Sequence, residues 1–188
     1  MICGVIFPLH NMLTQFNHIK QAYNDFRLSL LKDGKLPLRE TSAGFWGPSI
    51  CDELFMIFKK MRLECCNNFL DVGSGDGRVV LIASLFTKAQ GIELDLLLYK
   101  KSLEIRDRLG LAADFLHDDF FLHDFRKYDI LFCYPDKPLY YGLDQKFRDE
   151  LHGKLIVYGP PPADIGLPQE ESFRVNGTMV SVYHPSRT

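Results

Sequence analysis

The spacing of apolar residues changes along this chain: it is helical near the N-terminus and includes strand-like runs further on. Between residues 11 and 32 the apolar side chains recur at steps of three and four, which predicts an amphipathic helix. A loop punctuated by glycine and proline follows over residues 36–47. A second helix is predicted from Ile50 to Met61, with Ser49 as its N-cap.

From residue 67 onward, short apolar runs alternate with helical patterns, as in a series of β-α units. We expect helices over residues 78–86, 97–109 and 139–151. Near the end of the chain, Asn176-Gly177 separates two alternating runs, which is the strongest short signal for a β-hairpin. The predicted strands span residues 67–72, 89–92, 115–116, 128–134, 154–158, 172–175 and 178–184.

Length and composition limit the alternatives. A chain of 188 residues favours one domain, which we divide into an N-terminal helix and loop extension (1–48) and a core (49–188). A net charge of −2 gives no basic surface for constitutive nucleic-acid binding. The N-terminus has neither the basic start of a signal peptide nor an uninterrupted apolar span for a membrane. Five scattered cysteines without a C-x-x-C pair indicate a reduced compartment, so we expect a cytoplasmic protein.

The most informative segment is a glycine-rich turn between a predicted strand and a predicted helix. Glycines at alternate positions let the backbone turn tightly and let a ligand approach main-chain atoms. Such a turn, placed after a strand, predicts a nucleoside-type ligand. The candidate binding residues of this segment are Asp71, Gly73, Ser74, Gly75 and Gly77.

A second acid supports this interpretation. Glu93 ends the next apolar run, twenty positions after Gly73, where nucleoside-binding βαβ units place a carboxylate for the ribose hydroxyls. NAD(P) is the alternative ligand. Its fingerprint is G-x-G-x-x-G, however, and here the glycines follow G-x-G-x-G. Asp71 would also lie poorly beside a pyrophosphate but well beside the amino group or sulfonium of S-adenosylmethionine (SAM).

Residues 69–80, with an acid followed by G-x-G-x-G, resemble the first motif of the class I, seven-strand SAM-dependent methyltransferases. The resemblance spans residues 42–184 and implies a Rossmann-like, doubly wound α/β sheet, mostly parallel, with an antiparallel C-terminal hairpin strand and N-terminal helices. Residues 71–80 and 91–95 also resemble the small seven-strand protein-lysine methyltransferases. The resemblance implies SAM as the cofactor.

The same resemblance places further candidate residues. Trp46 lies in a loop that often covers the methionine end of SAM, although a hydrophobic plug over the core is an equal alternative. Leu94 would pack on the adenine face. The third motif places an acid near the adenine amino group, which is Asp118 by register, with Asp119 as the alternative.

The acceptor side is expected beyond the fourth core strand, where Tyr134 and Asp136 could accept hydrogen bonds from an amine nucleophile. The alternative is that both residues only shape the loop. Cys133-Tyr134-Pro135-Asp136 departs from the pattern of DNA amino-methyltransferases. The acidic and histidine residues of 117–124 lack the spacing of a known metal site, so no metal is expected.

Two functions of different class follow. The first is a methyltransferase that acts on an amine-type acceptor, with a protein lysine or another small amine as that acceptor. The second is a catalytically silent SAM-binding protein that works as a partner or scaffold. The least favoured function is that of an NAD(P)-binding enzyme. The sequence does not identify the acceptor or the oligomeric state.

Overall fold

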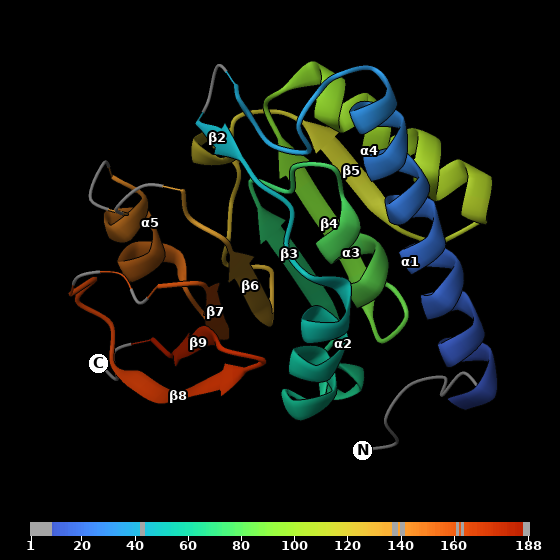
Figure 1. The fold of residues 1–188 in the computed structure, drawn as a ribbon. Coiled ribbons are helices and arrows are strands. Elements are labelled where there is room, and N and C mark those ends of the chain that lie inside the picture. Colours follow the sequence, from blue (N-terminus) through green and yellow to red (C-terminus); the bar gives the residue numbers. More distant parts are fainter. Residues whose placement is uncertain are drawn as a thin grey trace.

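The computed structural model describes residues 9–41, 44–136, 139, 142–160, 162 and 164–185. Its main sheet has seven strands in the order β5-β4-β3-β6-β7-β9-β8. The strands are β3 (Asn68–Val72), β4 (Lys88–Glu93), β5 (Asp114–His117), β6 (Ile130–Cys133), β7 (Lys154–Tyr158), β8 (Gln169–Val175) and β9 (Thr178–Tyr183). The first five run parallel, whereas β9 is antiparallel to both of its neighbours, β7 and β8. This confirms the predicted mixed sheet (Figure 1).

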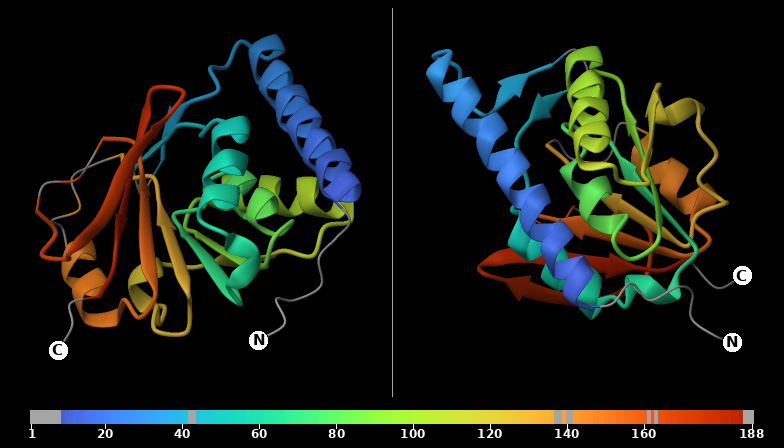
Figure 2. Two further views of the ribbon diagram at one scale, coloured as in Figure 1. Left: turned by 90° about the horizontal axis from the view of Figure 1, so that it is seen from below. Right: turned by 90° about the vertical axis from the view of Figure 1, so that its right-hand side faces the viewer.

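Helices cover the two faces of the sheet unequally (Figures 1 and 2). Of the α-helices in the described residues, four lie on one face and one lies on the other, and a separate apolar cluster fills each side. The α-helices are α1 (Leu9–Lys32), α2 (Cys51–Lys60), α3 (Arg78–Ala83), α4 (Leu96–Leu109) and α5 (Leu143–Glu150). The short 3-10 helices are η1 (Leu63–Cys65) and η2 (Phe120–Leu122).

Strand alternation explains the two clusters. On β3, Phe69 faces the cluster below α1–α4, whereas Leu70 and Val72 face the cluster below α5. In the first cluster the Phe16 ring of α1 stacks on the Phe55 ring of α2 at 4.3 Å between centroids. Both clusters are apolar and largely inaccessible to water, so burial of the two faces is the main stabilising contribution to this fold.

Several predicted boundaries need correction. Ser49 does not cap α2: Ile50 is the N-cap residue, no side chain caps the helix, and the Ser49 carbonyl instead accepts a hydrogen bond from Arg78 Nη1 at 3.0 Å. The loop predicted over residues 36–47 contains a two-stranded ladder of β1 (Arg39–Glu40) and β2 (Phe45–Trp46). The helix predicted over 139–151 begins at Leu143; residues 137–138 and 140–141 lie outside the described residues.

Strand order reverses between β3 and β6, because β3 pairs with β4 on one side and with β6 on the other. Open α/β sheets bind ligands beyond the carboxyl ends of the strands at such a point. The fold therefore places a candidate site beyond Val72, Glu93 and Cys133. Among the helices of the described residues, none combines the length and apolar character that a membrane crossing requires.

Candidate functional site

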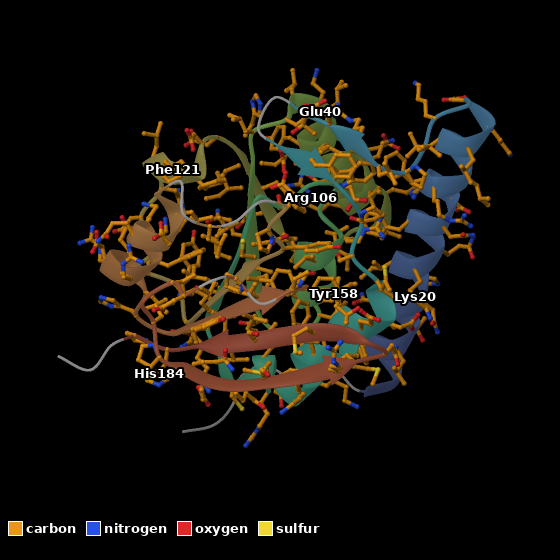
Figure 3. The ribbon with its side chains drawn as sticks, turned by 60° about the vertical axis from the view of Figure 1, so that its left-hand side comes forward. Lys20, Glu40, Arg106, Phe121, Tyr158 and His184 are labelled. Atoms are coloured by element: carbon orange, nitrogen blue, oxygen red, sulfur yellow. The ribbon has the colours of Figure 1, made fainter. Side chains whose placement is uncertain are left out.

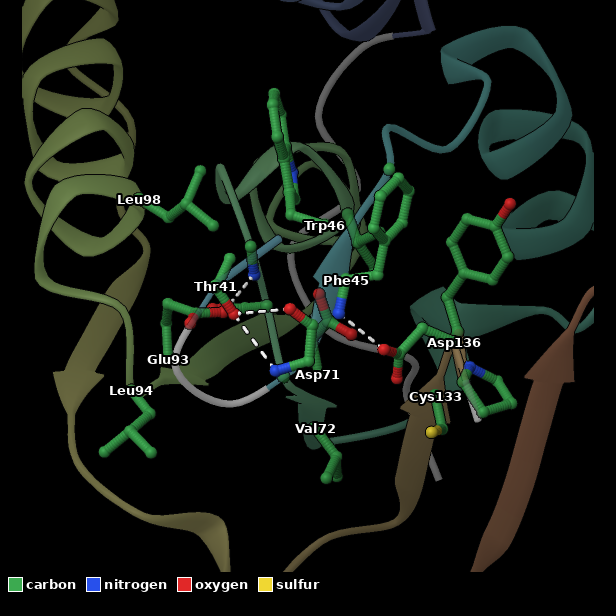
Figure 4. A pocket seen from close by; sticks show the side chains of 18 of the residues that line it. Thr41, Phe45, Trp46, Asp71, Val72, Glu93, Leu94, Leu98, Cys133 and Asp136 are labelled. Atoms are coloured by element: carbon green, nitrogen blue, oxygen red, sulfur yellow. Dashed lines mark hydrogen bonds between the residues drawn. The ribbon is translucent and has the colours of Figure 1, made fainter. Parts of the chain in front are cut away.

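A cavity of about 580 Å³ lies at this switch point (Figure 4). Its walls come from the carboxyl ends of β3, β4 and β6, and from residues 41 and 44–49. The volume is in the usual range for a small-molecule site. Figure 4 shows Asp71 between Glu93 and Asp136, with Trp46 above them.

The glycine-rich turn is tied to the neighbouring strand by its backbone. The amides of Gly73 and Ser74 both donate to the carbonyl of Ile92, at 3.1 and 2.8 Å. Gly73 and Gly75 have φ of +78° and +55°, a left-handed conformation that other residues rarely adopt. The turn therefore presents main-chain atoms, rather than side chains, to the cavity.

Glu93 links β4 to this turn. Its Oε2 accepts from the Gly75 amide at 2.7 Å, and its Oε1 accepts from the Asp95 amide at 2.7 Å. Burial raises the pKa of Glu93, and the two backbone donors oppose that rise. Each carboxylate oxygen can accept a second hydrogen bond, so Glu93 retains capacity for ligand hydroxyls.

The surroundings of Asp71 disfavour the charged form of its carboxylate. It is 2% exposed, and no described residue donates a hydrogen bond to its carboxylate. Burial, together with the nearby charges of Glu93 and Asp76, raises the pKa of Asp71 well above its usual value. A cationic ligand group in the cavity would relieve this penalty.

We therefore expect Asp71→Asn to raise the free energy of unfolding at pH 7 by about 0.5–2 kcal/mol, the usual scale for relieving strain at a functional site. Because the pKa is raised on folding, the native protein binds more protons than the unfolded chain above pH 3.8, and stability falls as pH rises through this window. Urea unfolding between pH 4 and 8 would measure this slope. An unchanged slope in the Asn variant would contradict the assignment.

Trp46 covers the glycine-rich turn. Its side chain is 9% exposed, and a Cβ placed on Gly75 would lie 2.8 Å from Trp46 Cδ1. The indole also contacts the Phe26 ring of α1, at 6.2 Å between centroids. Trp46 thus both lines the cavity and packs on α1.

Tyr134 and Asp136, which the sequence analysis assigned to the acceptor side, both line the cavity, but Asp136 is already engaged. Its Oδ2 accepts from the Phe45 amide at 2.5 Å. Tyr134 is 44% exposed and lies edge-on against the Tyr158 ring at 4.9 Å. Burial raises the pKa of the neighbouring Cys133 thiol, so this side chain stays protonated at neutral pH and is a poor nucleophile.

Three predicted binding residues lie outside the cavity lining. A Cβ on Gly77 would lie 2.5 Å from Ser102 Cβ, so this glycine serves the packing of α4 and β5. Asp119 accepts from the Phe121 amide and caps η2, while Asp118 accepts from the Asp119 amide. Leu94 does line the cavity.

The cavity also includes aromatic side chains from η2. Phe120 and Phe121 line the wall near the predicted adenine region. Phe121 lies beside the start of α5 (Figure 3), where a Cβ on Gly142 would be 3.6 Å from its ring. Within the described part of the chain, no three His, Cys, Asp or Glu side chains gather as metal ligands.

The sequence interpretation missed a buried network under the turn. Arg78 forms an ion pair with Asp76 at 2.6 Å and lies over the Tyr23 ring at 4.6 Å. The Tyr23 hydroxyl donates to the Asp76 carbonyl at 2.9 Å. Helix α1 is therefore attached directly to the turn. The Asp-Gly-Arg sequence was visible, but Tyr23, which lies 53 positions away, had no local signal.

No protein-family model and no curated protein sequence matches the chain. An RNA methyltransferase from Salinibacter ruber, solved with S-adenosyl-L-homocysteine, is 20% identical with a TM-score of 0.62, over 76% of this chain and 96% of that one. A ribosomal protein L11 methylase from Lactobacillus delbrueckii subsp. bulgaricus is 13% identical with a TM-score of 0.62, over 76% and 81%. A 16S rRNA N2 G1207 methyltransferase from T. Thermophilus, solved with AdoMet and guanosine, is 18% identical with a TM-score of 0.59, over 77% and 45%. The chain has the class I SAM-dependent methyltransferase fold, as its sequence predicts.

Proposed function

We propose that this protein is a SAM-dependent methyltransferase that acts on an amine-type acceptor, with a protein lysine as the acceptor that its site favours. The observation that carries the proposal is the charge of the cavity. Among the described lining residues, the carboxylates are Asp71, Asp76, Glu93 and Asp136, and the single cation, Arg78, is paired with Asp76. A cavity of this charge favours cationic ligand groups.

The residues present fit SAM. Glu93 has capacity for the ribose hydroxyls, and the buried Asp71 carboxylate suits the ammonium or sulfonium group. Ser74 Oγ is buried and has no hydrogen-bond partner among the described residues, which leaves a polar atom for a ligand. When bound, SAM supplies an electrophilic methyl group on a sulfonium. The contribution of the chain is to bind, orient and exclude water.

The same charge argues against NAD(P). A pyrophosphate would lie near the Asp71 carboxylate, and among the described lining residues the single cation, Arg78, is already paired with Asp76. Dinucleotide sites place the pyrophosphate at a helix N-terminus and use an acid like Glu93 for the ribose hydroxyls, so Asp71, directly before the turn, is the residue that disfavours a pyrophosphate here. The geometry therefore supports SAM over a nicotinamide cofactor.

The wall beyond β6 supports the proposed acceptor class. Tyr134 and Asp136 can accept hydrogen bonds from an amine and orient its lone pair. Phe45, Leu94, Phe121 and Tyr134 line the cavity and are all more than 40% exposed, so its mouth is apolar as well as acidic. An apolar rim favours an amine carried by a polypeptide, whose neighbouring side chains can cover these surfaces.

A SAM-binding protein without transferase activity is the second candidate. One observation favours it: Asp136, the carboxylate of the acceptor side, accepts the Phe45 amide and so is partly occupied. Incubation with methyl-labelled SAM and cell extract separates the two functions. Labelled protein supports the transferase, labelled RNA would change the acceptor class, and SAM binding without any labelled product would support the scaffold.

We expect Glu93→Ala to weaken SAM binding by about 1.5–3 kcal/mol, the scale of hydrogen bonds to a charged group. The substitution removes the carboxylate that accepts from the Gly75 and Asp95 amides, and with it the acceptor for ligand hydroxyls. Calorimetry would measure the change. Asp149→Ala removes an exposed carboxylate of α5 and is the control, which should bind SAM as the native protein does. If Glu93→Ala binds SAM with native affinity, the Glu93 carboxylate does not contact the ligand.

A further inference from the structure

We infer that Arg39, which does not line the cavity, is a positioning residue for the cofactor site, because it closes a ring of contacts that sets Glu93 and Trp46 against the glycine-rich turn. This inference rests on the proposed function. The name strap is used below for residues 39–41 and 44–46, the described part of the β1–β2 ladder and its connection.

The ring begins at an ion pair. Arg39 Nη2 lies 2.6 Å from Asp95 Oδ1, and the Asp95 side chain is only 10% exposed. The Asp95 amide donates to Glu93 Oε1, and Glu93 Oε2 accepts from the Gly75 amide. From Asp95 to the turn, each step is a hydrogen bond of 2.7 Å.

The strap completes the ring. Trp46 packs on Gly75, and Trp46 is paired with Arg39 in the antiparallel ladder of β1 and β2. The path Arg39–Asp95–Glu93–Gly75–Trp46 therefore returns to its starting residue. A displacement of the strap would change the cover over the turn and remove one support of the loop that carries Glu93.

Within this ring of contacts, the Arg39 side chain can be removed without loss of a helix or a strand. Asp95 also accepts from the amides of Leu97 and Leu98, so α4 keeps its N-cap when the guanidinium is absent. On the other side of the cavity, the strap has a second attachment, from the Phe45 amide to Asp136. Removal of Arg39 should thus release the strap at one end and leave the fold intact.

The test uses Trp46 as a reporter, since it is the only tryptophan of the chain. The native protein, Arg39→Ala, Arg39→Lys and Lys154→Ala would each be titrated with SAM by calorimetry, and quenching of Trp46 emission by acrylamide would be measured without SAM. Lys154→Ala is the control, because Lys154 is about as exposed as Arg39 (41% against 38%) and its removal breaks a 2.7 Å ion pair with Glu170 at the amino end of β7, away from the cavity.

We expect Arg39→Ala to raise the dissociation constant for SAM about five- to twentyfold and to increase quenching of Trp46, with an unchanged melting temperature. Arg39→Lys should restore most of the affinity, because the contact to Asp95 is a single charged hydrogen bond. The control should match the native protein in both measurements.

Other results would overturn the inference. Native affinity in Arg39→Ala would show that the ring does not act on the cofactor site and would leave the proposed function standing. Weakened binding with unchanged quenching would show that the effect does not pass through the strap. Failure of the native protein to bind SAM would remove the proposed function, and this inference with it.

Discussion

A Gly75→Val substitution is expected to abolish measurable SAM binding. The new Cβ would lie 2.8 Å from Trp46 Cδ1 and 3.0 Å from Trp46 Nε1, so the indole would have to leave the turn. Displacement of Trp46 opens the strap wall of the cavity, and the branched side chain occupies space beside the Glu93 carboxylate that accepts from the Gly75 amide. Calorimetry with SAM would measure the loss.

Backbone strain must be separated from this steric effect. Gly75 has φ of +55°, where valine costs about 1–3 kcal/mol in folding stability. Gly110→Val is the matched control, because Gly110 has φ of +62° and a Cβ there would meet no atom within 4 Å. Both variants should carry this backbone cost, and Gly75→Val should also lose the packing of Trp46, but only Gly75→Val should lose SAM binding. Equal affinity in the two variants would mean that the turn does not contact the cofactor.

Arg78→Ala is expected to lower the free energy of unfolding by about 3–5 kcal/mol, the usual result of removing one partner of a buried ion pair. Asp76 is 2% exposed and would be left charged without its partner, and the Ser49 carbonyl would lose its donor. The Tyr23 ring of α1 would also lose its cation contact. Urea unfolding followed by circular dichroism would measure the change.

Arg126→Ala is the control for this prediction. Its ion pair with Asp124 is similar in length, at 2.9 Å, but both side chains are more than half exposed, so we expect little or no loss of stability. The double variant Asp76→Asn/Arg78→Ala should recover part of the stability, because it removes the stranded charge. A loss in Arg78→Ala no larger than that of the control would contradict the buried network.

Local signals predicted the centre of the fold well. The strand before the turn, the alternate glycines and Glu93 lie within one stretch of chain, and their spacing is set by the βαβ unit itself. The Asn176-Gly177 turn likewise identified the β8–β9 hairpin, because its left-handed conformations, with φ of +48° and +95°, suit these two residues.

The remaining features depend on contacts that no local pattern contains. The strands β1 and β2 have two residues each, too short for a periodic signal, and they lie beside the sheet because of Arg39–Asp95 and Phe45–Asp136 contacts across 56 and 91 positions. Gly77 matched the motif but faces α4, since strand-helix packing determines its surroundings. Asp118 and Asp119 were placed by register alone, and their side chains serve the η2 turn.

The central claim is that this acidic cavity binds SAM rather than a nicotinamide dinucleotide. The most direct measurement is isothermal titration calorimetry of the purified protein with SAM and, in parallel, with NADPH, whose extra phosphate gives the largest charge contrast. We predict one SAM site with micromolar affinity and no heat of binding from NADPH. Binding of NADPH, or the absence of SAM binding by protein shown to be folded, would contradict the account.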